Sequence, residues 1–279
     1  MATAAKSTSG NMGRAIERFV LVTLVLLGGT TIVAASWARD LATPRVTVLG
    51  AERGISALIT ASSARVLILN GTDAAELGNA VEKAKHPGLD RLDVMIVSGN
   101  AAAADIAPRM IELLRPRLVL AVGSAASLET ASIVPDRIID HTTEIELPDG
   151  VLLTVELWPA AGGENDDVTW SVMVERGGAT VYWVADREAL MQDEVPDEAN
   201  VVVIGRGQPA TDTQFPATRI IVAAGESITG PELRARALDA IGPDSETVRI
   251  FAGETTRIDL DPEGIRSVDG GTMVATPVG

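Results

Sequence analysis

Short runs of hydrophobic residues, many of them alternating with polar ones, fill most of this chain, with a few stretches of helical spacing between them. Three β-branched runs, at 45–50, 55–60 and 65–70, are separated by turn sequences. Such runs predict antiparallel hairpins. The next segment, 72–85, has apolar residues at helical spacing, and Thr72 stands where it would cap the first turn. We therefore expect three strands followed by a helix.

The middle of the chain alternates strand and helix patterns. An apolar run at 92–97 is followed by helical spacing over 104–114 and by a second apolar run at 117–122. Alternation of this kind is typical of parallel βα units. We expect the two strands to lie parallel in one sheet.

A second β-rich half begins near Arg137. Most of its runs alternate, and two further apolar runs follow at 201–205 and 219–225. Helices are expected at 186–192 and 231–241. The runs VRIF, TRIDL and IRSV predict small hairpin strands that close the chain. Two β-rich halves with interleaved helices predict one sandwich of two sheets with helices outside.

The stretch from Phe19 to Trp37 holds no charged residue across 19 positions. A helix of that length spans roughly 28 Å, close to the hydrocarbon thickness of a bilayer. Arg14 and Arg18 precede it, which predicts a cytoplasmic amino terminus. A cleavable signal peptide shares the basic start, but its apolar run is shorter, and Trp37 makes a poor cleavage site. The pattern favours a single-pass anchor.

Charge is unevenly distributed along the chain. Residues 1–37 hold three basic side chains against one acidic, or +2, while the whole chain holds 23 basic and 38 acidic side chains. The remainder therefore holds 20 basic and 37 acidic side chains, or −17. A surface this acidic repels phosphate backbones and anionic headgroups, which argues against a nucleic-acid partner. The chain has no cysteine, so disulfides and thiolate metal sites are excluded.

The segment that follows the strand at 92–97 contains little reactive chemistry. In α/β proteins this position usually holds ligands, and here it reads SGNAAAADIAP, at 98–108. The alanines are typical of the first turn of a helix. The two histidines, His86 and His141, stand in expected loops, and no ligand-type residue lies at metal-binding spacing from either.

The order of elements resembles the metallo-β-lactamase-like domain of the ComEC family of competence (DNA-uptake) proteins. The opening strands of that domain are matched by VTVLGAERGISALI and RVLILNG. Later segments of the family are matched by DGVLLTVELWP, ENDDVTWSVMVERGG, TVYWVAD and VVVIGRGQ. The resemblance covers roughly residues 45–270. It implies an α/β fold, an αββα metallo-β-lactamase-like sandwich, here preceded by one transmembrane helix.

The chain departs from the family at the metal site. In the family, the strand matched by LDVMIV leads into a T-H-x-H-x-D-H motif, and a His-His pair follows a later strand. The matching positions of this chain are Gly99, Ala101, Ala103, Ala104, Gly205 and Arg206, and only Asp186 keeps a ligand-type side chain. One carboxylate cannot hold zinc, which takes three or four ligands, and without metal hydrolysis loses its hydroxide nucleophile. We expect no metal, no cofactor and no catalytic residue.

Two interpretations of Asp186 remain open. The simpler one is that it caps the helix expected at 186–192, a role that Asp fills well. The other is that Asp186 pairs with Arg206, so that a guanidinium stands where the family holds metal. That pairing requires the two side chains to lie within about 10 Å, near the Debye length.

The expected organisation has five parts: a cytoplasmic tail at 1–18, the transmembrane helix at 19–37, a linker at 38–44, the metallo-β-lactamase-like domain at 45–270 and a tail at 271–279. These features favour a non-catalytic scaffold or accessory subunit of a membrane assembly, with a protein partner or a second copy. Its domain would lie outside the cytoplasm. Two alternatives remain: a metal-dependent phosphoester hydrolase, which metal content distinguishes, and a DNA-uptake accessory protein, which salt-sensitive DNA affinity distinguishes.

Overall fold

The structure is a computed structural model in which the strands and two helices of the expected domain are described. The described residues are 43–51, 54–70, 74–84, 91–98, 101–122, 133–159, 168–185, 196, 199–205, 219–223, 246–250, 254–270 and 272–274. They belong to one compact unit that begins at Thr43. No helix in these ranges is long and apolar enough to span a bilayer, and the predicted segment 19–37 lies outside them.

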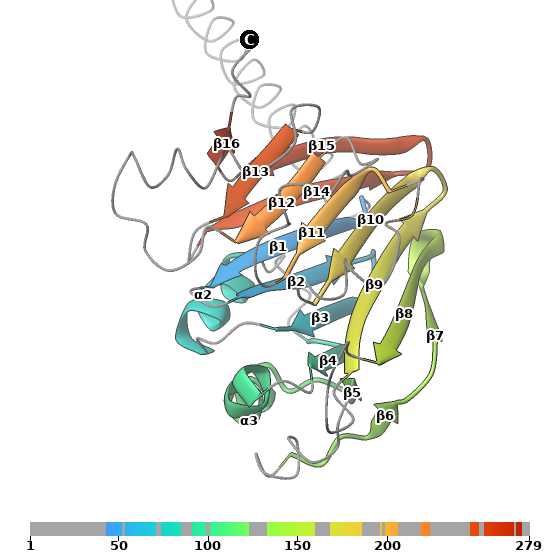
Figure 1. The fold of residues 1–279 in the computed structure, drawn as a ribbon. Coiled ribbons are helices and arrows are strands. Elements are labelled where there is room, and N and C mark those ends of the chain that lie inside the picture. The colour runs from blue at the N-terminus through green and yellow to red at the C-terminus, as the bar shows by residue number, and fades with distance from the viewer. Residues whose placement is uncertain are drawn as a thin grey trace, which may run out of the picture. The chain divides into compact units, whose positions relative to one another are not determined.

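Two mixed sheets of eight strands each form the domain (Figure 1). The first, sheet A, has the order β15-β14-β1-β2-β3-β4-β5-β6. Its strands are β1 (Arg45–Ala51), β2 (Gly54–Thr60), β3 (Arg65–Leu69), β4 (Val94–Ser98), β5 (Leu118–Val122), β6 (Arg137–Ile139), β14 (Thr255–Asp261) and β15 (Gly264–Gly270).

The second, sheet B, has the order β16-β13-β12-β11-β10-β9-β8-β7. Its strands are β7 (Thr143–Leu147), β8 (Val151–Pro159), β9 (Val168–Arg176), β10 (Ala179–Val184), β11 (Val201–Ile204), β12 (Arg219–Ala223), β13 (Glu246–Ile250) and β16 (Thr272–Val274). A single 3-10 turn at Pro148–Gly150 joins β7 to β8.

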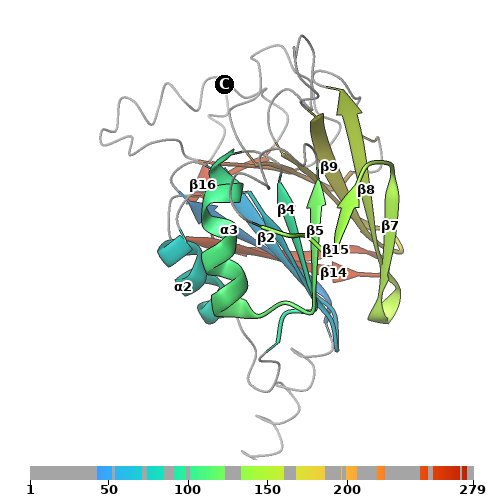
Figure 2. The same cartoon turned by 90° about the horizontal axis from the view of Figure 1, so that it is seen from below.

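The two helices α2 (Ala74–Ala84) and α3 (Ala101–Leu114) lie against the outer face of sheet A. Figure 2 shows β2, β4 and β5 between these helices on one side and β7, β8 and β9 on the other. The helices expected at 186–192 and 231–241 lie outside the described residues. The described part therefore comprises one helical layer and two sheets of the expected αββα sandwich.

Most predicted pairings are confirmed. Strands β1, β2 and β3 pair antiparallel in sequence order, as the turn-separated runs predicted. Strands β4 and β5 are parallel, with α3 in their connection, as predicted for a βα unit. Strand β3 also lies parallel to β4, with α2 in that connection. Long connections of this kind are what parallel pairing requires.

Three predictions for the later strands were wrong. Strand β13 is no hairpin partner of β14: it lies in sheet B, parallel to β12, because the connection between β12 and β13 is long enough for a crossover. Strand β6 extends sheet A parallel to β5 rather than opening the second half. Beyond residue 270, where a tail was expected, β16 pairs antiparallel with β13.

Alternation along strands β1 to β5 of sheet A supplies two separate cores. On β3, Val66 and Ile68 belong to the core between the sheets, whereas Leu67 and Leu69 pack beneath the helices. A strand covered on both faces needs a continuous apolar run, as RVLIL shows. Each such side chain contributes on the order of 1.5–3 kcal/mol when fully buried.

At one end of the sandwich the β9–β10 turn touches the β14–β15 turn of the other sheet. Gly177 has φ of 58°, and a Cβ there would lie 2.4 Å from the carbonyl oxygen of Pro262. The next residue, Gly178, donates its N–H to the same oxygen at 2.7 Å. Only glycine allows this approach, so the turn joins the sheets at the end opposite the predicted site.

Candidate functional site

Strands β3 and β4 of sheet A and β10 and β11 of sheet B end at the edge where the family resemblance placed the metal site. Alternation determines which side chains face the other sheet there. On β4, Ile96 belongs to the inter-sheet core, so Ser98 points the same way. On β3, Ile68 has that direction, and Asn70, directly after the strand, shares it.

Three hydrogen bonds cross between the sheets at this edge. The Nδ2 amide of Asn70 donates to the carbonyl oxygen of Ala185 at 2.9 Å. The indole Nε1 of Trp170 donates to Oγ of Ser98 at 3.2 Å. The main-chain N–H of Ile55 donates to the carbonyl oxygen of Gly205 at 2.7 Å. We call these three bonds the inter-sheet seam.

Gly205, at a predicted site position, lies directly after β11 and is buried. Its N–H donates to the carbonyl oxygen of Val184 at 2.7 Å. A Cβ on this glycine would lie 2.7 Å from the carbonyl oxygen of Ala185, 2.7 Å from Nδ2 of Asn70 and 2.8 Å from the carbonyl oxygen of Val184. Distances below 3.0 Å leave no room for a side chain, so the histidine of the family pattern does not fit this backbone.

The seam residues are deeply buried and hold one another in place. Asn70 is 2% exposed and Ser98 is 3% exposed. The main-chain N–H of Asn70 donates to Oγ of Ser56 at 3.1 Å, which orients the amide side chain. Trp170 packs against Trp183, with ring centroids 4.9 Å apart and planes tilted by 53°, a favourable aromatic arrangement. The chemistry of this seam is that of neutral donors and acceptors.

Helix α3 begins at Ala101, so the alanine run does open a helix, as predicted. Ala103 and Ala104 are 0% and 2% exposed and lie in the core between sheet A and the helices. At these two positions the family carries its ligands Asp and His. Here both are methyl groups packed under α3, so this part of the helix contributes to the core.

The other predicted site positions are less fully described. Gly99, Asp186 and Arg206 lie outside the described residues, as does His86, so the pairing of Asp186 with Arg206 stays a prediction. Within the described residues no group of three or more His, Cys, Asp or Glu side chains is placed to hold a metal ion.

His141 lies on the surface between β6 and β7, as its loop position predicted. Its side chain is 64% exposed, and Nδ1 lies 2.5 Å from Oδ1 of Asp140. This hydrogen bond lowers the pKa of the Asp140 carboxyl below its ordinary value, and the main chain of Asp140 adds to the effect. The pair is exposed, so it forms a local surface interaction.

Sequence reasoning missed Asn70 and the bond between Trp170 and Ser98. A polar Asn-Gly pair directly after the apolar run RVLIL was the available signal for Asn70. For Trp170 and Ser98 no local signal exists, because the two residues are 72 positions apart and belong to different sheets.

Comparisons with known proteins bear on the fold. No family model matches this sequence, and no curated protein matches it. The chain is similar to the solved FEZ-1 metallo-beta-lactamase from Legionella gormanii at 14% identity and a TM-score of 0.39, over 51% of this chain and 60% of that one. It therefore spans about 60% of the length of that protein.

The chain is also similar to two further solved structures. A metallo-beta-lactamase with a HARLDQ motif from Cronobacter sakazakii is 14% identical, with a TM-score of 0.38, over 77% of this chain and 80% of that one. The isothiocyanate hydrolase from Delia radicum gut bacteria is 15% identical, with a TM-score of 0.45, over 75% of this chain and 97% of that one. The activities in these names belong to those proteins.

Proposed function

We propose that this chain is a membrane-anchored, extracytoplasmic, non-catalytic protein with a metallo-β-lactamase-like domain of the ComEC type. Its role is that of a scaffold or accessory subunit in a membrane assembly, and its surface serves a protein partner. The anchor is the uncharged segment 19–37, and the domain follows it.

The observation that carries the non-catalytic role is the inter-sheet seam. A hydrolase of this kind needs three or four metal ligands and a metal-bound hydroxide at the strand ends. The described strand ends instead carry Asn70, Ser98 and Gly205, which bond to or pack against the opposite sheet. Because these groups already bond to or pack against the opposite sheet, they are better suited to a structural role than to binding a metal or a substrate.

The backbone itself opposes the return of ligands at these positions. A side chain at Gly205 meets two carbonyl oxygens, of Ala185 and Val184, at less than 3 Å. A carboxylate at Ala103 would be buried in the apolar core between α3 and sheet A, which is costly for an unpaired charge. The departures from the family pattern are therefore built into the packing.

Metal content tests the proposal. The full-length chain, purified in detergent after growth with added zinc and manganese and without chelator, is expected to carry well under one metal ion per chain by elemental analysis. A portion dialysed against EDTA supplies the blank. Hydrolysis of a phosphodiester reporter is expected to match that blank.

About one zinc or manganese per chain, together with hydrolysis that EDTA abolishes, would contradict the proposal. That result would establish the alternative, a metal-dependent phosphoester hydrolase whose ligands come from positions outside the family pattern.

A further inference from the structure

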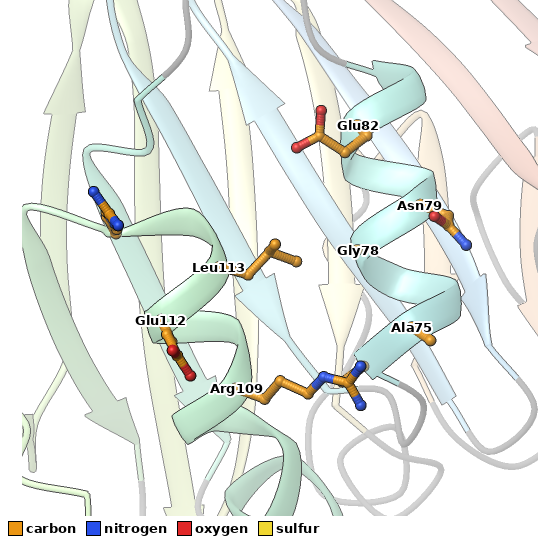
Figure 3. Close-up of a pocket in the computed structure, with 9 residues that line it drawn as sticks. Ala75, Gly78, Asn79, Glu82, Arg109, Glu112 and Leu113 are labelled. Carbon is orange, nitrogen blue, oxygen red and sulfur yellow. The ribbon is translucent and has the colours of Figure 1, made fainter.

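Helices α2 and α3 lie side by side on the outer face of sheet A, the face turned away from sheet B and the inter-sheet seam. A groove runs between the two helices. The groove has a volume of about 630 Å³. Small residues of α2, Ala74, Ala75 and Gly78, line one side, and Leu113 lines the other. Figure 3 shows Leu113 extending from α3 toward α2 beside Gly78.

Leu113 is an exposed apolar group at the centre of this groove. Its exposed fraction is 52%, high for a leucine on a helix that packs against a sheet. A Cβ on Gly78 would lie 2.9 Å from Cδ2 of Leu113, so the glycine keeps the groove open beside the leucine. A lone exposed leucine is ordinary, but one seated between two helices with small residues opposite forms an apolar recess.

Charged side chains surround this apolar centre. Arg109 and Arg115 bring two positive charges, and Glu82 and Glu112 bring two negative ones. Among the side chains that the structure describes, the groove therefore carries as many positive as negative charges, on a chain whose net charge is −15. An apolar centre with a charged rim is the usual anatomy of a protein–protein interface.

Three of the rim charges are available for a partner. Within the part of the chain that the structure describes, the side chains of Arg109, Glu112 and Arg115 form no ion pair. Arg115 directly follows α3 with φ of 47°, and its N–H bonds the carbonyl oxygen of Ile111 at 2.9 Å. Glycine is the usual residue in this left-handed position, so the arginine adopts it at some cost in strain.

The presence of both charges favours a second copy of this chain as the molecule that occupies the groove. A surface that meets a second copy of itself across a two-fold axis must be complementary to itself. A patch of one sign would repel its own copy. Among the described side chains the groove carries both signs on two adjacent helices, so a copy turned about a two-fold axis can set arginines against glutamates.

We propose that the α2–α3 groove is the interface of a homodimer, in which Leu113 of each copy packs into the groove of the other and the rim arginines face the partner's glutamates. The inference adds a second copy of this chain to the proposed scaffold function. It rests on the groove and not on the absence of catalysis.

The test measures the self-association of the full-length chain by sedimentation equilibrium in density-matched detergent. The unmodified chain is expected to be dimeric at micromolar concentration. Leu113→Asp is expected to raise the dimer Kd at least tenfold, because it places a carboxylate in the apolar recess of each copy. The matched control is Val134→Asp, at a side chain 91% exposed and away from the groove, which is expected to leave the Kd unchanged.

A charge exchange separates a specific interface from a general loss of structure. Arg109→Glu alone is expected to weaken the dimer, and the double variant Arg109→Glu with Glu112→Arg is expected to recover at least part of the lost affinity. Equal melting temperatures of all variants would show that folding is intact.

Disulfide cross-linking gives a second measurement, which reports contact between the two grooves and not association through the segment 19–37. Because the chain has no cysteine, Leu113→Cys introduces a single thiol, and copper phenanthroline would oxidise two such thiols to one disulfide across the interface. The matched control is Val134→Cys, which is expected to remain monomeric on a non-reducing gel.

A chain that is monomeric at all concentrations overturns the proposal. So does a dimer that Leu113→Asp leaves intact, since such a dimer forms elsewhere. Neither result would bear on metal content, so this proposal and the proposed function can fail separately.

Discussion

Gly205 shows how one residue can decide what a strand end is able to carry. The position looks permissive in sequence, because a loop glycine is common. In the structure, two main-chain carbonyl oxygens and the amide of Asn70 occupy the place where a side chain would begin. The glycine allows β11 to approach β10 and Asn70 closely, and this approach leaves no space for a ligand.

We expect Gly205→Ala to destabilise the fold by about 1–3 kcal/mol, the usual cost of overpacking, because the atoms that it meets include main-chain oxygens that cannot move aside. The measurement is the free energy of unfolding in urea. The matched control is Gly78→Ala, which meets only the flexible end of Leu113 and sits in a helix, where alanine gains roughly 0.5–1 kcal/mol over glycine. Equal losses in both variants would show that the packing at Gly205 is not special.

At the scale of elements, the sandwich is joined at both ends by contacts between the sheets. At one end Gly178 and Pro262 bring two turns together, and Arg176 donates to the carbonyl oxygen of Leu260 at 2.7 Å. At the other end the inter-sheet seam joins β3 to β10 and β4 to β9. The second of these ends is the edge where the sequence resemblance predicted the metal site, and in the structure its described residues join the two sheets.

The bond between β4 and β9 can be tested by a double-mutant cycle. Ser98→Ala leaves the buried Nε1 of Trp170 without its acceptor, which is expected to cost about 1–3 kcal/mol. Trp170→Phe removes the donor and part of the ring, and the double variant is expected to lose less than the sum of the two. Urea unfolding of the four proteins gives the coupling energy.

An exposed hydrogen bond supplies the control for that cycle. Thr143→Ala removes the bond from Oγ1 of Thr143 to the carbonyl oxygen of His141, which is exposed, and is expected to change stability by no more than about 0.5 kcal/mol. Full additivity of Ser98→Ala and Trp170→Phe would mean that the two side chains do not stabilise each other.

At the scale of the whole molecule, the chain combines a +2 segment containing an uncharged stretch with a remainder of −17. Such a remainder is repelled by anionic headgroups, and the segment 19–37 is the proposed membrane anchor. The hydrophobic stretch is long enough to cross the bilayer by itself.

We expect the full-length chain to stay with the membrane pellet after washing with alkaline carbonate, and the variant lacking residues 19–37 to appear in the supernatant. Protease added to the outside of intact spheroplasts is expected to digest the domain. Recovery of a soluble product shortened at its amino terminus would instead identify the segment as a cleaved signal peptide.

Much of the fold was predictable from local pattern. The runs that became β1 to β5 and the spacing that became α2 and α3 were visible because each element buries a repeating face, with a period of two or of about 3.6 residues. The sheet to which β6 and β13 belong was not visible, and neither was β16. An edge strand of three residues, such as β16, carries too few positions to show a pattern.

The candidate site, like the fold, could be predicted from the sequence only in part. Gly205 follows the end of β11 and the alanine run opens α3, as the hydrophobic pattern predicted, whereas their correspondence to a family metal site stays a prediction. The seam could not be predicted, because Asn70 and Ala185 are 115 positions apart and their bond depends on how the sheets stack.

The sequence by itself therefore determined most of the elements, the acidic composition and the residue types at the predicted site positions, since these depend on residue identity and on spacing within one element. Only the tertiary structure decided that Ser98, Asn70 and Gly205 join the sheets and that Leu113 stands open between two helices. Such features depend on contacts between residues far apart in the chain. Local periodicity carries no information about which of the many possible partners a strand end or a helix face meets.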